Sequence, residues 1–216
     1  MRCVVFDLDG TLADTSADLL AAANASLPRA VLGPGDALTA FHGGRAMLRL
    51  GFSRLRMDWS EADVDASYPV LLEAYRGGIA THTRLYPGAM EAVEALRGRG
   101  FAVSVCTNKP EGLAEMLLTA LGVRGAFGAL VGADTFPVRK PDPLPYRAAV
   151  ERAGGAVGRS MLVGDTETDA KTGVAAGVPV ALVTFGPEGA GVSRFNPAAL
   201  LDRFEELPGL AERLLR

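Results

Sequence analysis

Five short apolar runs, each followed by polar residues, dominate the hydrophobic pattern of the chain. They are Cys3–Phe6, Ala102–Cys106, Ala129–Val131, Met161–Val163 and Val180–Val183. Short apolar runs bounded by polar or turn-forming residues are typical of strands that are buried on both faces. The pattern therefore predicts a sheet that is covered on both sides.

Helical patterns alternate with the later apolar runs. We expect helices at residues 89–97, 111–121, 146–153 and 169–176, with glycine close behind each of them. Glycine just past a helix is the expected C-terminal cap. Since strands that alternate with helices form parallel sheets, the predicted fold is α/β, with a doubly wound, Rossmann-like parallel sheet.

The distance between the first and second apolar runs breaks this alternation. One strand-plus-helix unit takes about 30 residues, so the stretch from Asp9 to Thr107 leaves roughly 65–70 residues in surplus. A loop of that length without secondary structure is improbable in a compact domain. The surplus therefore predicts a second, smaller domain inserted after the first strand.

The inserted region has helical patterns of its own. They lie at residues 17–26, 37–50 and 64–76, and a capping signal formed by Ser60 and Asp63 precedes the last one. We expect residues 14–83 to form a small, all-helical domain, and residues 1–13 and 84–216 to form the core.

The composition argues against several kinds of partner. The chain has 216 residues, a formal net charge of −3 and no basic stripe, so it gives no support for nucleic-acid binding. The longest apolar runs are too short to span a membrane, and the N-terminus lacks the features of a signal peptide. Cys3 and Cys106 fall in predicted strands, as expected for buried thiols in a reducing compartment. We expect a cytoplasmic monomer or homodimer.

Two carboxylates, Asp7 and Asp9, directly follow the first apolar run. Like charges so close together raise each other's cost of ionisation, and in proteins such a pair is usually neutralised by a bound divalent cation. Ligands of a doubly wound sheet bind at the carboxyl ends of its strands, so the polar residues behind the other runs should converge there. These residues are Thr107, Asn108 and Lys109 after the second run, Lys140 before the fourth, and Asp165 and Asp169 after it.

This set of side chains suits phosphoryl transfer. Mg²⁺ held by Asp7, Asp165 and a backbone carbonyl would draw in a phosphate oxygen, because carboxylates alone would repel a phosphate. Lys140 would balance the charge, and Thr107 with backbone N–H groups would bind the other oxygens. One carboxylate can then form an aspartyl-phosphate, while a second protonates the leaving oxygen and deprotonates the attacking water.

Four motifs in this order make the chain resemble the haloacid dehalogenase-like hydrolase superfamily. They are DLDGT at 7–11, Thr107-Asn108, Lys140-Pro141 and GDTETD at 164–169. Within it the chain is most similar to the phosphoglycolate phosphatase-like group, on the stretches at 7–27, 86–101, 107–110 and 131–134. The resemblance implies a magnesium-dependent phosphatase for a small phosphorylated metabolite, with phosphoglycolate favoured. The insertion would be that group's helical cap, which closes over the substrate.

The resemblance also implies a role for each motif residue. Asp7 would be the nucleophile and Asp9 the general acid and base, with Lys140 as the third catalytic residue. Asp7, the backbone carbonyl of Asp9, and Asp165 would hold Mg²⁺. The remaining motif residues would have supporting roles: Thr107, Asn108 and Lys140 at the transferring phosphoryl group, Asp169 beside the metal or Lys140, and Gly10 and Gly164 within the motifs.

Several alternatives stay open at this point. Asp9 argues against dehalogenation, because a halide leaves without a proton. A phosphomutase of the β-phosphoglucomutase type would share the core chemistry, and a non-catalytic binding or regulatory protein is less favoured. Arg45 of the insertion is either a partner for a substrate carboxylate or a solvated arginine. Lys109 either acts at the site or only leads into the following helix, without a role in binding or catalysis.

Overall fold

The computed structural model describes residues 1–56 and 58–216. Residue 57, which falls within the predicted insertion, lies outside the described residues. The chain forms two compact units. Met1–Ala13 and Leu85–Arg216 make up the first, called the sheet unit here, and Asp14–Arg84 make up the second, called the helical unit.

The sheet unit is built on a six-stranded sheet. Its strands are β1 (Cys3–Phe6), β4 (Ala102–Cys106), β5 (Ala129–Val131), β6 (Ser160–Gly164), β7 (Val180–Val183) and β8 (Ala199–Leu201). They lie in the order β5-β4-β1-β6-β7-β8, and every neighbouring pair is parallel. The predicted doubly wound parallel sheet is confirmed. The edge strand β8 was not predicted from the sequence.

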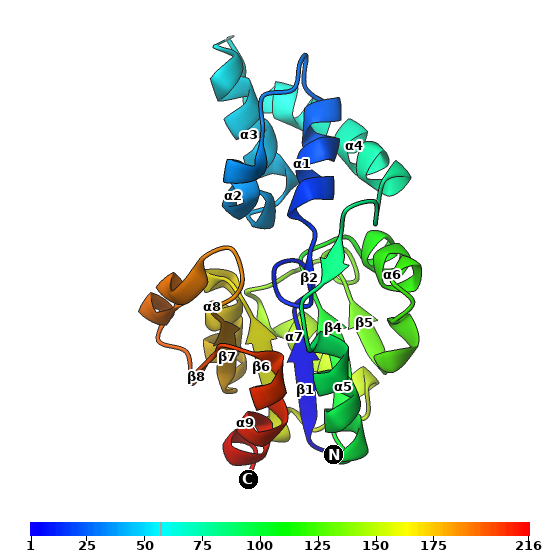
Figure 1. Ribbon diagram of the computed structural model, residues 1–216, viewed down its shortest axis with the longest axis vertical. Helices are drawn as coiled ribbons and strands as arrows, with labels where there is room; N and C mark the ends of the chain where they lie inside the picture. The colour runs from blue at the N-terminus through cyan, green and yellow to red at the C-terminus, as the bar shows by residue number, and fades with distance from the viewer. Residues whose placement is uncertain (57) are drawn as a thin grey trace. The chain divides into compact units, whose positions relative to one another are not determined.

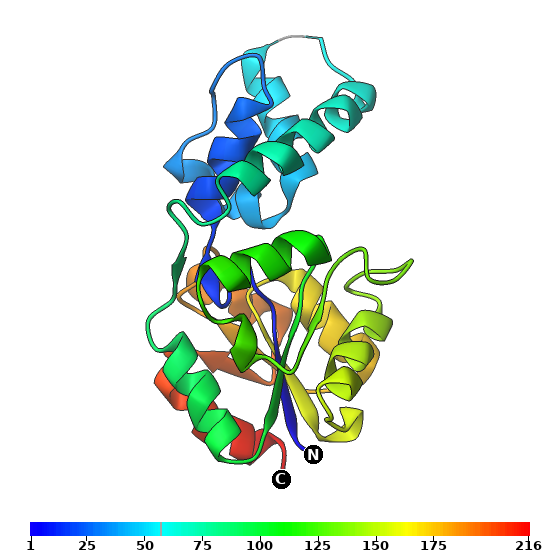
Figure 2. The same cartoon turned by 90° about the vertical axis from the view of Figure 1, so that its right-hand side faces the viewer.

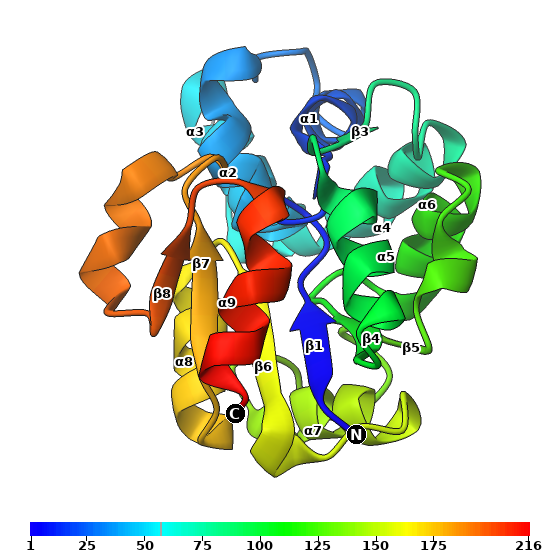
Figure 3. The same ribbon diagram turned by 60° about the horizontal axis from the view of Figure 1, so that its bottom comes forward.

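Helices cover both faces of this sheet (Figures 1 and 3). One face carries α7 (Pro143–Arg152) and α8 (Glu167–Ala176), the other carries α5 (Ala89–Gly98) and α9 (Leu207–Leu214), and α6 (Glu111–Ala120) packs on β5. Figure 3 shows α5 and α9 side by side in front of the strands. Covering both faces explains why β1 consists only of buried apolar residues. Short 3₁₀ turns lie at Arg124–Ala126, Val157–Arg159, Gly189–Phe195 and Phe204–Glu206.

Two of these helices begin earlier than the apolar pattern indicates. In α7 the side chain of Asp142 accepts a hydrogen bond from the N–H of Leu144, so the helix begins at Pro143. In α8 the side chains of Thr166 and Asp169 form a capping box, so this helix begins at Glu167. Polar capping residues therefore fixed helix starts that hydrophobic periodicity alone missed.

The core of the sheet unit contains both cysteines as free, buried thiols. Burial raises the pKa of Cys3 to about 11 and that of Cys106 to about 12, so both remain protonated near neutral pH. Tyr146, buried beside them, shares a hydrogen bond of 2.7 Å with the hydroxyl of Ser160. The cysteines are packing residues, as predicted.

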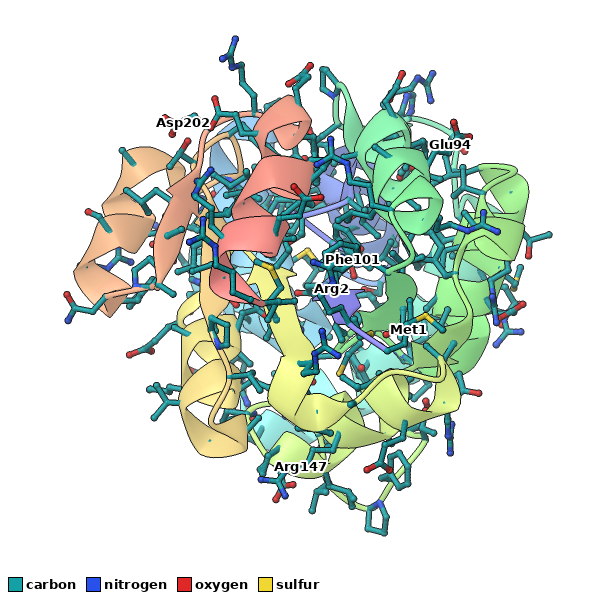
Figure 4. The ribbon with its side chains drawn as sticks, turned by 90° about the horizontal axis from the view of Figure 1, so that it is seen from below. Met1, Arg2, Glu94, Phe101, Arg147 and Asp202 are labelled. Carbon is teal, nitrogen blue, oxygen red and sulfur yellow. The ribbon has the colours of Figure 1, made fainter. Side chains whose placement is uncertain are left out.

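The amino ends of the strands form the edge seen in Figure 4, where Met1, Arg2 and Phe101 lie near the centre of the view. The guanidinium carbon of Arg2 lies 4.1 Å from the ring centroid of Phe101. These residues precede β1 and β4. The polar motif residues follow the same strands, so they belong to the opposite edge of the sheet.

The helical unit contains α1 (Ser16–Ala25), α2 (Ala37–Phe41), α3 (Gly44–Leu55) and α4 (Glu61–Gly77), with a 3₁₀ turn at Pro34–Asp36. Figure 2 shows α1, in blue, beside α4, and these two helices pack on each other. The single helix predicted at 37–50 is wrong. Gly43 has φ of +96°, a conformation that interrupts an α-helix and separates α2 from α3.

One local prediction for the helical unit is confirmed. The backbone N–H and the hydroxyl of Ser60 each donate to Asp63 at 2.8 Å, which is the predicted capping signal of α4. On the same helix Leu71 and Tyr75 are buried and Leu72 is partly buried, so they belong to the core of this unit. The chain passes between the two units through β2 (Ala13–Asp14) and β3 (Arg84–Leu85), which pair with each other.

Candidate active site

The carboxyl edge of the sheet brings the predicted motifs together. The N–H of Asp7 donates to the carbonyl of Val163 on β6 at 2.9 Å, and the N–H of Thr107 donates to the carbonyl of Val131 on β5 at 3.0 Å. Asp165 immediately follows β6. Because β4, β1 and β6 are adjacent and parallel, their carboxyl ends place Thr107, Asp7 and Asp165 in one row.

Lys140 joins two of the carboxylates. Its Nζ lies 3.1 Å from Oδ1 of Asp7 and 2.6 Å from Oδ1 of Asp169, and its side chain is 1% exposed. Burial alone would lower the pKa of Lys140, but Asp169 and Asp7 outweigh burial and hold it above the usual value. Lys140 is therefore an ammonium group at any working pH and balances part of the negative charge.

Of the two carboxylate oxygens of Asp165, one accepts a hydrogen bond from a described residue and the other does not. Oδ1 accepts a hydrogen bond of 2.8 Å from the hydroxyl of Thr11. Oδ2 is buried and has no hydrogen-bond partner among the residues that the structure describes. Burial, and then the charges of Asp169 and Asp7, raise the pKa of Asp165 well above the usual range. A buried acceptor without a partner is costly, which indicates a place for a ligand.

Asp7 is also in an environment that opposes its charge. Burial raises the pKa of Asp7 to about 6, assisted by Asp169 and Asp9 and opposed by Lys140 and by the N–H of Leu8. That N–H donates to Oδ1 of Asp7 at 2.7 Å. Lys140 and the backbone therefore hold this carboxylate in place, although its charge is unfavourable without a further cation.

The described residues can hold a metal ion here. Asp7, Asp165 and Asp169 each offer a carboxylate oxygen, and these oxygens all lie within 4.8 Å of one another. These three carboxylates face the ammonium group of Lys140, while Asp9 is paired with Lys109. The two negative charges left over match one divalent cation, and oxygen ligands are those that Mg²⁺ prefers. The unsatisfied Oδ2 of Asp165 fits the same ligand.

Asp169 is the member of this cluster that is already fully engaged. Its Oδ1 contacts Lys140, and its Oδ2 accepts from the N–H and the hydroxyl of Thr166 at 3.2 and 2.8 Å. A Cβ at residue 164 would lie 2.3 Å from Cγ of Asp169, so Gly164 is required for this packing. The contacts suit Asp169 to supporting Lys140 rather than to holding a metal.

Two other predicted residues make specific contacts at this edge. Nδ2 of Asn108 donates to the backbone carbonyl of Lys140 at 3.0 Å, which links the second motif to the third. Gly10 has φ of +81°, and its N–H donates to the carbonyl of Ala13 at 2.9 Å, so it turns the chain directly after Asp9. The glycine is needed because residues with a side chain rarely adopt this conformation.

Lys109 lies at this edge, where the sequence predicted it, but its partner was not predicted. Its Nζ lies 2.8 Å from Oδ1 and 3.1 Å from Oδ2 of Asp9, and its side chain is 3% exposed. The sequence carried one signal, since lysine occurs at only three positions of this arginine-rich chain. Lys171, another of the three, is exposed on α8, as expected for a surface residue.

Arg45 lies in the helical unit, on α3. It forms an ion pair with Asp65, and its guanidinium carbon lies 4.6 Å from the ring centroid of Tyr68. Its side chain remains 43% exposed. These contacts are internal to the helical unit, so a role for Arg45 in binding a substrate stays a prediction.

Comparisons with known proteins agree with one another. A family model described as haloacid dehalogenase-like hydrolase matches residues 1–177. A phosphoglycolate phosphatase of Mesorhizobium japonicum is 39% identical over 218 residues, covering 99% of this chain and 96% of that protein. One of Cereibacter sphaeroides is 38% identical over 219 residues, covering 100% of both. The crystal structure of a predicted phosphoglycolate phosphatase from Haemophilus somnus matches with a TM-score of 0.81 at 25% identity, covering 97% of each chain.

Proposed function

Since the chain belongs to the haloacid dehalogenase-like hydrolase family, we propose that it is a magnesium-dependent phosphatase that hydrolyses phosphoglycolate through an aspartyl-phosphate on Asp7. The observation that carries this proposal is the placement of Asp7 between Lys140 and Asp165 at the carboxyl edge of the sheet. Relatives named phosphoglycolate phosphatase that match almost the whole chain support the choice of substrate.

In the first step Asp7 attacks the phosphorus atom. A bond forms between a carboxylate oxygen of Asp7 and phosphorus, and the bond from phosphorus to the glycolate oxygen breaks. Lys140 and the N–H of Leu8 hold the attacking carboxylate in one orientation, which lowers the entropy cost of the attack. Lys140, Thr107 and Asn108 are our candidates for binding the oxygens of the phosphoryl group.

Asp9 moves the protons in both steps. It donates a proton to the glycolate oxygen as that oxygen leaves, since an alkoxide is a poor leaving group. It then takes a proton from water while the water attacks phosphorus, and the bond between phosphorus and Asp7 breaks. Phosphate leaves, and Asp7 and Asp9 return to their starting states.

We assign the metal to Asp7 and Asp165, with the backbone carbonyl of Asp9 as a third ligand. When bound, a divalent cation supplies positive charge that offsets the repulsion between the carboxylates and the phosphoryl group. The unsatisfied Oδ2 of Asp165 and the excess of carboxylates over ammonium groups support this assignment. The choice of Mg²⁺ rests on the oxygen-only ligand set.

We further propose that the sheet unit is the catalytic core and that the helical unit is the cap that contacts the leaving group. The two units divide after Ala13 and after Arg84, whereas the predicted boundaries lie after residues 13 and 83. Closure of a cap over a bound substrate would exclude water from the reaction.

The partner we propose is a small phosphate ester, bound by a cytoplasmic monomer or homodimer. The net charge of −3 favours no polyanionic partner such as nucleic acid. Both cysteines are free, which fits a reducing compartment. None of the described helices has the length and apolar composition needed to cross a bilayer.

The test is phosphate release from phosphoglycolate by the purified protein. We expect turnover with Mg²⁺, loss of turnover after EDTA, and recovery when Mg²⁺ is restored. Turnover that persists unchanged in EDTA would contradict the metal assignment, and no release from phosphoglycolate would contradict the substrate. Conversion of β-glucose 1-phosphate to glucose 6-phosphate would instead favour the phosphomutase alternative, and we expect none.

A further inference from the structure

Lys109 and Lys140 bind carboxylates at the same edge in different ways. Lys140 contacts one oxygen of Asp7 and one of Asp169. Lys109 contacts both oxygens of a single carboxylate, that of Asp9, at 2.8 and 3.1 Å. Contacts to both oxygens restrict the rotation of a carboxylate about its Cβ–Cγ bond more than a contact to one oxygen does.

The backbone of Lys109 is itself fixed. Its N–H donates to the hydroxyl of Thr107 at 3.2 Å, and its carbonyl accepts from the N–H of Ala133 at 3.0 Å. Pro110 follows directly and begins the entry into α6, whose first N–H, that of Glu111, donates to Asp134 at 2.7 Å. The ammonium group therefore extends from a segment that is held by both β4 and the loop after β5.

Asp9 has the most water-accessible side chain of the carboxylates paired with the two lysines. Its side chain is 17% exposed, against 12% for Asp7 and 0% for Asp169. A carboxylate with access to water gains hydration by turning outward, so a restraint is needed to hold it inward. Lys109, which is 3% exposed, supplies that restraint from the buried side.

We propose that Lys109 is a positioning residue that fixes the carboxylate of Asp9 for proton transfer to the leaving oxygen of the substrate. The inference rests on the proposed role of Asp9 as general acid. It adds a lysine that acts through Asp9, separate from the lysine that acts on Asp7. Holding a catalytic acid in one orientation is a recognised contribution to proton transfer.

The leaving group separates this role from a purely structural one. Ethyl phosphate releases an alkoxide, which needs a proton as it leaves, whereas p-nitrophenyl phosphate releases a stable phenolate, which does not. The quantity kcat/KM reports the steps up to formation of the aspartyl-phosphate. A defect in positioning Asp9 should therefore lower kcat/KM for ethyl phosphate much more than for p-nitrophenyl phosphate.

The experiment compares Lys109→Met with Lys171→Met, which removes an exposed lysine from α8. We expect Lys109→Met to lower kcat/KM about 100-fold for ethyl phosphate and less than about threefold for p-nitrophenyl phosphate. Lys171→Met should leave both values unchanged. Lys109→Arg should recover part of the loss, because a guanidinium group can also contact both oxygens of a carboxylate.

A double-mutant cycle with Asp9→Asn tests whether Lys109 acts through Asp9. In the Asp9→Asn background the further change Lys109→Met should have almost no effect on ethyl phosphate hydrolysis, since the group to be positioned is absent. Thermal unfolding of each variant, measured beside the assays, identifies any loss that comes from unfolding.

Three outcomes would overturn the inference: an equal loss with both esters, an undiminished loss in the Asp9→Asn background, or faster hydrolysis of ethyl phosphate by Lys109→Met. The proposed substrate fails separately, if the unaltered protein hydrolyses ethyl phosphate but not phosphoglycolate. If the unaltered protein hydrolyses no phosphate ester at all, both proposals are wrong.

Discussion

The two units of this chain bury carboxylates in opposite ways. In the helical unit, Asp18 is 4% exposed and accepts hydrogen bonds from the N–H groups of His82 and Thr83 and from the hydroxyl of Thr83. In the sheet unit, Asp165 is just as buried, but its Oδ2 has no hydrogen-bond partner in the described part of the chain. A satisfied carboxylate stabilises its fold, whereas an unsatisfied one indicates a ligand.

Ion pairing follows the same division. In the helical unit Arg54 contacts both oxygens of Asp36 at 2.6 and 2.5 Å, and Arg49 contacts both oxygens of Glu61 at 2.8 and 2.7 Å. Each of these cations faces one carboxylate. At the carboxyl edge of the sheet the carboxylates outnumber the ammonium groups, so that region has an excess of negative charge. The comparison predicts that charge removal costs activity in one unit and stability in the other.

The largest effect should come from Asp7→Asn. An amide cannot form the aspartyl-phosphate, so kcat should fall by a factor of about 10⁴ or more. The melting temperature should not fall, because burial raises the pKa of Asp7 to about 6 and the ionised side chain therefore opposes folding at neutral pH. Steady-state kinetics and calorimetry measure the two quantities. Near-normal turnover by this variant would disprove the covalent mechanism.

Asp165→Asn tests the metal site directly. We expect Mg²⁺ affinity, measured by titration calorimetry, to fall by about 100-fold or more, because a charged ligand is lost. The metal-free variant should melt no lower than the metal-free original, since the amide removes a buried negative charge whose second oxygen has no hydrogen-bond partner in the described structure. Unchanged Mg²⁺ affinity would place the cation elsewhere.

Asp18→Ala should show the reverse pattern in the helical unit. The substitution leaves the part-buried N–H of His82 and the buried N–H of Thr83 without an acceptor, at a cost of about 3 kcal/mol in the free energy of unfolding. Asp18→Asn, which keeps an accepting oxygen, serves as the control and should lose less. Urea unfolding gives the free energies, and hydrogen exchange of the amide of Thr83 reports the local change. A loss below about 0.5 kcal/mol would contradict the assigned role.

The smallest effect should come from Asp36→Asn, at about 1 kcal/mol at pH 7, because Arg54 is partly exposed. The side chain of Arg54 holds the pKa of Asp36 below its usual value. A lowered pKa stabilises the fold above the unfolded-state value near 4, and this stabilisation is lost as the pH falls through the folded-state pKa. The two proteins should therefore become equally stable in acid. A difference that is constant from pH 7 to pH 3 would contradict this account.

The sequence predicted those parts of the molecule that local patterns encode. The strands β1, β4, β5 and β7 were predicted to the residue, because each is a run of buried residues between polar or turn-forming ones. The motif residues could be placed at one edge because parallel strands run in the same direction, so their carboxyl ends lie together. The three-residue strand β8 and the helix α9 were missed, since their patterns are short and no recognisable motif adjoins them.

The side-chain contacts within the candidate active site were harder to predict from the sequence. The pair formed by Lys109 and Asp9 joins residues about 100 positions apart, so no local spacing reveals it. Asn108 was expected to contact phosphate, but its bond to the backbone carbonyl of Lys140 depends on how the loop before α7 folds back. The break between α2 and α3 depends on the backbone conformation of Gly43, which hydrophobic periodicity does not report.

The central position of β1 has a consequence for the order in which the protein matures during synthesis. β1 is made first, yet its partners β4 and β6 begin at Ala102 and Ser160. The helical unit, Asp14–Arg84, leaves the ribosome before either partner does. We expect this unit to fold during synthesis. Over the same period β1 remains an unpaired apolar segment that chaperones can bind. Asp7 and Asp9 reach their final surroundings only after β6, which ends at Gly164, has also left the ribosome.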